Sequence, residues 1–199
     1  MAETINIHSP FKTAAMTTAP AVQNDLSLLI RDCINQSRSA QKRLYDLYAP
    51  AAYGVIRRYL FNNESLAQEI LNDSFFKVLT KLEQYTFQGA FEGWIRRIVI
   101  NTITDHLRKN IKDDQPHKEV QPEDAYVHSE SVEKMSHKEL LNVIQLIPET
   151  QRTVFNLFVF ENYSHKEIGN ILGISENNSR WHLNDARKRL KEKINLLLK

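Results

Sequence analysis

The residues best suited to binding a nucleic acid lie near the end of the chain, within residues 163–190. Ser164 and Glu167 have the spacing of a capping box that starts a helix, and Gly173 supplies the left-handed residue that ends it. Ser175 can then cap a second helix with a regular apolar face. Amide and basic side chains read base edges and bind phosphates when a helix enters the major groove. The outward side of the second helix is expected to carry Asn177, Asn178, Arg180, Trp181, Asn184, Arg187 and Lys188.

Local charge distinguishes this helix-turn-helix interpretation from the alternative of a helical hairpin without a DNA-binding role. Many helical hairpins have a Gly turn and a basic outer face that is merely solvated. Residues 180–199 contain seven Lys or Arg against two acidic residues, a net of +5 in a chain of net +2. Charge of one sign on one element favours phosphate binding over a solvated face.

Residues 85–110 form a second segment with the composition of a nucleic-acid surface. Its helix carries four basic side chains and one amide: Arg96, Arg97, Asn101, Arg108 and Lys109. Aromatic rings beside a basic helix can hold unstacked bases while the helix follows the backbone. Core packing is the preferred interpretation for Phe91 and Trp94, which share the phase of the apolar residues that follow. Tyr85 and Phe87 lie in the loop ahead of the helix, where burial is harder to arrange, so we expect them to be exposed.

The elements that must position these residues are predicted to be helices. Residues 1–23 are rich in Thr, Ala and Pro without a sustained period, which predicts a disordered tail. A helical period begins at residue 24, and a second helix is expected after Ser39, interrupted at Pro50.

A third helix has the clearest amphipathic pattern. Ser65 and Gln68 have capping-box spacing at its start. Four polar residues cover much of its outer face, and the pattern alone favours a solvated surface for them: Glu69, Asn72, Asp73 and Lys77.

The helical period is lost between residues 111 and 135, where acidic residues outnumber basic ones seven to two from Asp113 to Lys134. This acidic stretch predicts a flexible linker between two small helical domains, residues 24–110 and 136–199, in an all-α chain. Ser136 and Glu139 form another capping box at the start of the second domain.

Composition limits the classes of function. The chain has 199 residues with 42% apolar and 25% charged residues, which is typical of a soluble globular protein. It lacks a long apolar run and a signal peptide, and its single cysteine excludes an internal disulfide, so we expect a cytoplasmic protein without membrane insertion. No nucleotide-binding loop, hydrolase motif or metal-ligand spacing is present. We therefore expect neither catalysis nor a cofactor or metal.

Three blocks of the chain together resemble a bacterial RNA polymerase sigma factor of the extracytoplasmic-function (ECF) group. Residues 67–85 resemble the clamp-binding helix of region 2. Residues 91–109 resemble the part of region 2 that melts and reads the −10 element, with its Trp, paired Arg and Asn. Residues 148–190 resemble region 4, which reads the −35 element, and the whole match runs from about Asn24 to Leu197.

The resemblance implies partners and roles. Promoter DNA and core RNA polymerase would be bound, an anti-sigma factor is expected, and the linker would thread toward the polymerase active centre. The loop from Tyr85 to Ala90 would capture a flipped base near Asn101, with Arg96, Arg97, Arg108 and Lys109 along the backbone path. The clamp of the largest polymerase subunit would face Glu69, Asn72, Asp73 and Lys77. The −35 duplex would meet Asn177, Asn178, Arg180, Trp181 and Asn184.

Some residues depart from the pattern of the group. His182 and Asp185 stand where many relatives carry Arg, Trp181 replaces a small polar residue, and Phe87 stands where Gly is frequent. Asp185 would repel a phosphate, so it contacts a cytosine amino group or turns away. An autonomous helix-turn-helix regulator is the main alternative function, although it leaves the first domain unexplained; a nucleic-acid enzyme is the other.

Overall fold

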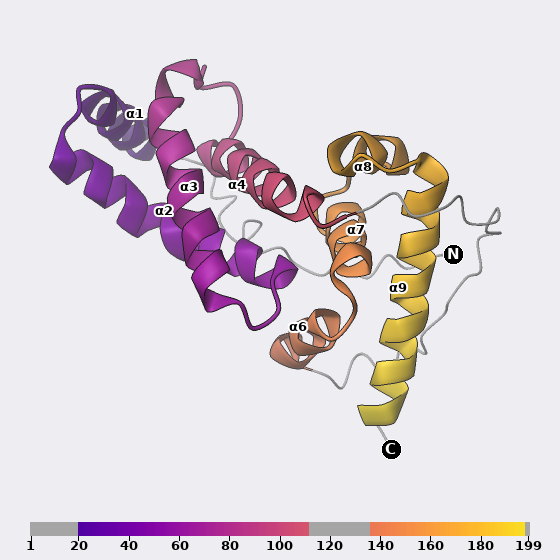
Figure 1. The fold of residues 1–199 in the computed structure, drawn as a ribbon. Helices are drawn as coiled ribbons and strands as arrows, with labels where there is room; N and C mark the ends of the chain where they lie inside the picture. The colour runs from indigo at the N-terminus through magenta and orange to yellow at the C-terminus, as the bar shows by residue number, and fades with distance from the viewer. Residues whose placement is uncertain (1–19, 112–135, 198–199) are drawn as a thin grey trace. The chain divides into compact units, whose positions relative to one another are not determined.

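The computed structural model of the chain describes residues 20–111 and 136–197 (Figure 1). Those residues form helices and connections without a strand, which confirms the all-α fold. The elements are α1 (Pro20–Ile34), α2 (Arg38–Tyr59), α3 (Glu64–Thr80), the short 3-10 helix η2 (Leu82–Gln84), α4 (Phe91–Arg108), α6 (His137–Gln145), α7 (Glu149–Val159), α8 (His165–Leu172) and α9 (Glu176–Leu197). Within the described ranges, none of these helices has both the length and the apolar character needed to span a membrane.

The chain forms two compact units. The first contains the described residues up to Arg57 together with Asn63–Ile103, and the second contains Arg58–Asn62 and the described residues from Thr104 onward. The last two residues of α2 and the last turn of α4 thus belong to the second unit, whereas the sequence predicted a division at residue 110. Helix α1 also begins ahead of residue 24. The rest of the predicted tail and nearly all of the predicted linker lie outside the described residues.

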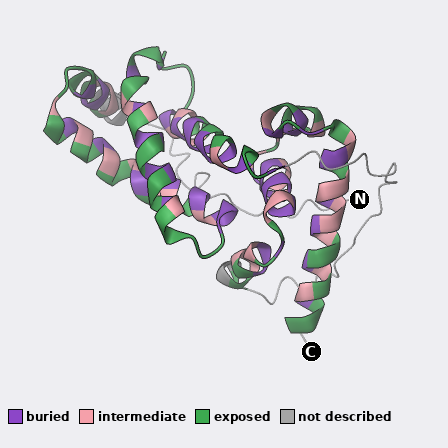
Figure 2. Cartoon of the chain, viewed as in Figure 1, coloured by how far each residue is buried: buried purple, intermediate pink, exposed green. Residues whose placement is uncertain are grey.

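Apolar side chains from successive helices form the core of the first unit. Leu44, Val55, Ile70 and Ile95 are each 0% exposed. Removing a side chain of this size from water stabilises the fold by about 1.5–3 kcal/mol. Figure 2 shows the buried positions recurring along α4, as expected of a helix with one apolar face.

Two local features of the first unit differ from the prediction. Helix α2 continues through Pro50, which was expected to interrupt it. Pro50 is exposed, so the hydrogen bond that its missing N–H cannot make is lost on the solvent side. Helix α3 is capped by Asn63 rather than Ser65, because the Asn63 side chain accepts a hydrogen bond from the Leu66 N–H at 3.1 Å.

Both predicted capping boxes of the second unit are confirmed. The hydroxyl oxygens of Ser136 and Ser164 accept hydrogen bonds from the backbone N–H groups of Glu139 and Glu167, respectively. In return, each glutamate carboxylate accepts a hydrogen bond from the backbone N–H of its serine. These hydrogen bonds hold the pKa of each glutamate carboxyl below its usual range. The starts of α6 and α8 are therefore fixed by local sequence.

A buried arginine fixes the connection between α6 and α7. Arg152 is 5% exposed. Its guanidinium donates hydrogen bonds to the carbonyl oxygens of Gln145 and Ile147, each at 2.9 Å, and of Tyr59 at 2.8 Å. Burial lowers the pKa of this guanidinium. Carbonyl groups at the end of a helix carry partial negative charge and offset part of the cost of burying a cation. Arg152 thereby holds the start of α7, which packs against α9.

Candidate nucleic-acid surfaces

The turn between α8 and α9 has the geometry of a helix-turn-helix. Gly173 has a left-handed backbone, with φ of 72°. The carbonyl oxygen of Gly169 accepts hydrogen bonds from the N–H groups of Gly173 at 2.8 Å and Ile174 at 3.1 Å. A Cβ on Gly169 would lie 2.7 Å from the Ile174 carbonyl oxygen, so the two segments approach as closely as a side-chain-free residue permits. The predicted helix-turn-helix is confirmed.

The outer face of α9 keeps most of the predicted DNA-binding residues accessible. Arg180 and Lys188 are exposed. Four more are half-buried: Asn177, Trp181, Asn184 and Arg187. Asn178 is only 3% exposed, so its predicted outward position is wrong. It lies in the first turn of α9, which begins immediately after the close approach to Gly169, and its N–H donates to Ser175 Oγ at 3.1 Å.

Asp185 is directed away from the outer face. Its carboxylate accepts hydrogen bonds from the Gln151 side chain at 2.9 Å and from Arg189 Nε at 2.8 Å. Of the two alternatives left open for this acidic residue, the structure shows the turned-away one. His182, the other departure, is half-buried, with its ring 5.0 Å from that of Trp181.

An aromatic and basic cluster, absent from the sequence predictions, joins three helices of the second unit. The His165 ring of α8 stacks on Phe158 of α7 with centroids 4.6 Å apart, and its Nδ1 lies 3.0 Å from Ser179 Oγ of α9. The guanidinium of Arg187 lies 5.9 Å from the Phe158 centroid. Desolvation by burial, and then the positive charge of Arg180, lowers the pKa of His165. No regular spacing connects residues from three helices, so only the fold reveals this cluster.

The loop ahead of α4 differs from the sequence prediction at one of its two aromatic residues. Tyr85 is 8% exposed, so its predicted exposure is wrong, whereas Phe87 is 44% exposed as expected. Burial raises the pKa of the Tyr85 hydroxyl. Phe91 is 1% exposed, which confirms its predicted core packing, and Trp94 is half-buried with its ring stacked at 5.6 Å from Phe91. Tyr85 was judged from its place in a loop, but the aromatic residues of α4 cover it.

The polar residues predicted along α4 lie mostly on an accessible side. Arg97, Asn101 and Arg108 are exposed, and their spacing of four and then seven residues places them on one side of the helix. Lys109 is exposed just after the helix ends, and Arg96 is half-buried. A nucleic-acid backbone can therefore follow this side of α4.

The outer face of α3 presents carboxylates and one large aromatic ring. Glu69, Asn72 and Asp73 are exposed, and Phe76, at matching helical spacing, is 70% exposed. Lys77, which was predicted to belong to this face, is half-buried and donates a hydrogen bond to Thr102 Oγ1 at 3.2 Å. Its ammonium group therefore points toward α4.

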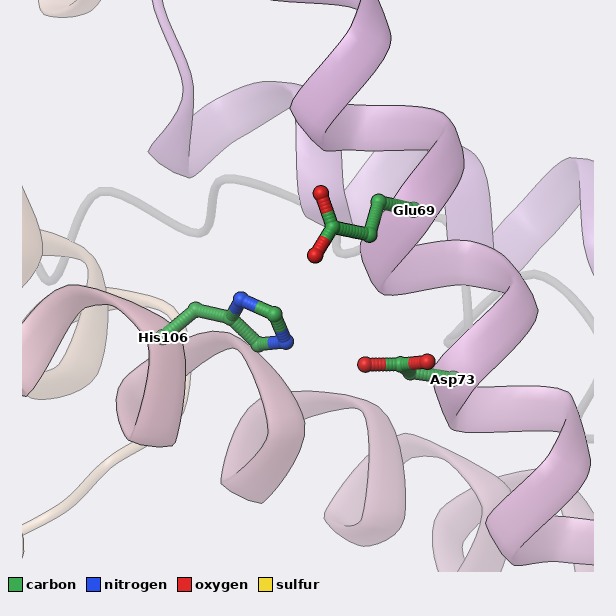
Figure 3. A group of neighbouring side chains, drawn as sticks. All are labelled: Glu69, Asp73 and His106. Atoms are coloured by element: carbon green, nitrogen blue, oxygen red, sulfur yellow. The ribbon is translucent and has the colours of Figure 1, made fainter.

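Figure 3 shows the side chains of Glu69 and Asp73 on α3, which project from the same side of the helix. The two carboxylates of α3 are exposed and can bind a basic partner. The residue pattern alone favoured a solvated face for these carboxylates, and the family resemblance implied that they face the polymerase clamp. That role and the expectation of no metal both stay predictions.

The exposed face of α9 and the loop with α4 together define a DNA-binding protein of the helix-turn-helix class. Residues 44–112 match the family model described as Sigma-70 region 2, and residues 137–190 match the model described as Sigma-70, region 4. The chain therefore belongs to the sigma-70 family of transcription initiation factors, in its extracytoplasmic-function group.

Named relatives agree with this assignment. RNA polymerase sigma factor SigZ of Bacillus subtilis is 27% identical over 135 residues, covering 66% of this chain and 74% of the relative. RNA polymerase sigma-H factor of Pseudomonas aeruginosa is 23% identical over 186 residues, covering 83% and 94%. ECF RNA polymerase sigma factor SigW of Bacillus subtilis is 24% identical over 190 residues, covering 85% and 98%.

Proposed function

We propose that the chain binds core RNA polymerase in the cytoplasm and directs it to promoters, with one unit opening the −10 element and the other binding the −35 duplex. The observation that carries this proposal is the presence of both sigma-70 regions in one chain. The proposed function consists of binding to polymerase and promoter DNA and includes no catalytic step.

The −10 element is assigned to the loop of residues 85–90 and to α4. Unstacking a base costs a few kcal/mol. Stacking it on an exposed aromatic ring returns about 1–3 kcal/mol, and Phe87 offers such a ring. Asn101 has an exposed side-chain amide, a group that can hydrogen-bond to base edges, so base recognition is assigned to it. Backbone contacts are assigned to Arg96, Arg97, Arg108 and Lys109.

The −35 duplex is assigned to α9. Arg180 is exposed, and its guanidinium can make a bidentate contact with a base. Such a contact contributes about 1–3 kcal/mol. Asn178 is left out because it is buried. The remaining contacts are assigned to Asn177, Trp181, Asn184, Arg187 and Lys188. Binding through these cations releases counterions, so affinity should fall as salt rises.

Core polymerase is assigned to α3, through Glu69, Asn72 and Asp73. Lys77 is left out because its ammonium group is turned toward α4. A basic surface on the clamp of the largest subunit is the expected partner. An anti-sigma factor that covers these surfaces stays a prediction.

The test is reconstitution of the chain with core RNA polymerase on a promoter library, and specific start sites are expected. Asn101→Ala should reduce open complexes without changing polymerase binding. Charge reversal of Glu69 and Asp73 to Lys should instead reduce co-purification with polymerase. Tight binding of palindromic duplexes by the chain alone, without any effect on start sites, would support the autonomous regulator and refute the proposal.

A further inference from the structure

The loop between η2 and α4 is held in an unusual conformation. Phe87 has φ of 58° and Gly89 has φ of 98°, both in the region that L side chains rarely adopt. Glycine adopts such angles without a steric cost, whereas a bulky aromatic residue adopts them only at a steric cost. A surrounding structure must therefore fix the backbone at Phe87, and strained residues of this kind often lie at binding sites.

Tyr85 supplies that fixation. Its hydroxyl donates a hydrogen bond to the Gly89 carbonyl oxygen at 2.8 Å, which ties the two ends of the loop together. Its buried ring lies 4.9 Å from the Phe87 ring and 4.9 Å from the Phe91 ring of α4. A third contact, at 5.6 Å, joins it to Trp94. Tyr85 is thus anchored on α4 and supports Phe87 from within the unit.

Phe87 is left with an accessible ring. It is the exposed aromatic residue of this loop, at 44%, and it contacts Tyr85 in a tilted arrangement with 52° between the ring planes. An aromatic ring supported on one side and open on another can accept a base, because every base has a π-face.

We propose that Tyr85 is a positioning residue, which fixes the loop so that Phe87 presents its ring to an unpaired base. Tyr85 itself does not contact the nucleic acid, contrary to its role as predicted from the sequence. This inference rests on the proposed function of the −10 unit and deepens it, because it assigns stacking to one residue and support to another.

The test measures binding of a single-stranded −10 oligonucleotide by the reconstituted holoenzyme, with 2-aminopurine at successive positions to report stacking by fluorescence. Tyr85→Phe keeps the ring and removes only the hydroxyl, and should weaken binding about two- to tenfold, the range of one hydrogen bond. Phe87→Ala should weaken it by about tenfold or more, and Phe87→Trp should restore most of the loss. Tyr53→Phe is the matched control, because the Tyr53 hydroxyl is also hydrogen-bonded, to Glu64, away from the loop.

A double-mutant cycle distinguishes support from direct contact. If Tyr85 acts through Phe87, Tyr85→Phe should have no further effect once Phe87 is Ala. Gly89→Ala should reproduce the Tyr85→Phe defect, because its φ disfavours Ala although the space around it is open. An undiminished Tyr85→Phe effect in the Phe87→Ala background would overturn the inference, and so would wild-type binding by Tyr85→Phe. In either case specific transcription by the wild-type holoenzyme would leave the proposed function standing, whereas its absence would remove both.

Discussion

Gly169 offers the sharpest test of the helix-turn-helix geometry. It lies inside α8, where alanine would ordinarily be favoured over glycine by about 1 kcal/mol. A Cβ at this position would lie 2.7 Å from the carbonyl oxygen of Ile174. That oxygen belongs to the backbone of the turn, so it cannot move aside as the end of a flexible side chain would.

The magnitude follows from the balance of these two effects. An ordinary contact begins near 3.4 Å, so the turn would have to open by about 0.7 Å. Overpacking of this kind costs about 1–3 kcal/mol, and a backbone obstacle places the cost toward the upper end. After subtraction of the helix-propensity gain, Gly169→Ala should destabilise the second unit by about 2 kcal/mol. It should also weaken −35 binding, because α9 moves relative to α8.

Urea unfolding of the full chain measures this effect, with Trp181 as the fluorescent probe of the second unit in a Trp94→Phe background, and with Trp94 as the probe of the first unit in a Trp181→Phe background. Two glycines serve as controls, since a Cβ on either meets nothing within 4 Å. Gly54→Ala, in the interior of α2, should stabilise the first unit by about 0.5–1 kcal/mol. Gly173→Ala should cost about 1–2 kcal/mol through its left-handed φ alone. A Gly169→Ala chain as stable as the wild type would refute the close approach of α8 to the turn.

Two further predictions concern polymerase binding and pH. Phe76→Ala should weaken binding to core polymerase by about tenfold or more, as loss of an aromatic anchor does at an interface. Leu47→Ala, a control whose side chain is 57% exposed on α2, should leave this binding unchanged. Equal affinities measured for both variants would contradict a polymerase-binding role for Phe76. Because burial and Arg180 lower the pKa of His165 in the folded chain, the unfolded chain binds the extra proton as pH falls below about 6.5. The second unit should therefore lose stability on acidification through that range, and the urea midpoint of His165→Gln should lack this component of the pH slope; an identical slope in both chains would rule out His165 as its source.

The features that could be predicted from sequence are those that neighbouring residues determine by themselves. A serine and a glutamate three residues apart satisfy each other's backbone groups wherever the helix lies, so the capping boxes at Ser136 and Ser164 were predictable. The same holds for Gly173, whose left-handed conformation ends α8 without help from distant residues. The capping box at Ser164 and the left-handed Gly173 thus predicted the first helix of the helix-turn-helix and its turn, and the box at Ser136 predicted the start of α6.

The errors occur where a residue's environment comes from another helix. Tyr85 is buried because aromatic side chains of α4 cover it, and Lys77 is turned inward because Thr102 Oγ1 accepts a hydrogen bond from its ammonium group. Asp185, for which the sequence left two alternatives open, turns away from the outer face of α9 because Gln151 of α7 offers an amide donor. Helical periodicity gives the direction of a side chain on its own helix, but it does not give the residue of another helix that the side chain contacts. Each of these three positions required the packed structure.

Two of the cations proposed to bind DNA, Arg108 and Arg180, form exposed pairs with acidic side chains, and this affects specificity. Arg180 pairs with Glu176, and Arg108 lies 3.5 Å from Asp105, all with side chains about half exposed. Exposed pairs of this kind contribute only about 0.2–1 kcal/mol. Exchanging a carboxylate for a phosphate therefore costs little once DNA is held close, but the carboxylates reduce the attraction to DNA at a distance. With a net charge of +2, the free chain should bind random DNA weakly. Attachment to polymerase raises the effective concentration of both surfaces at one promoter, so partial neutralisation of the cations favours DNA binding by the holoenzyme over binding by the free chain.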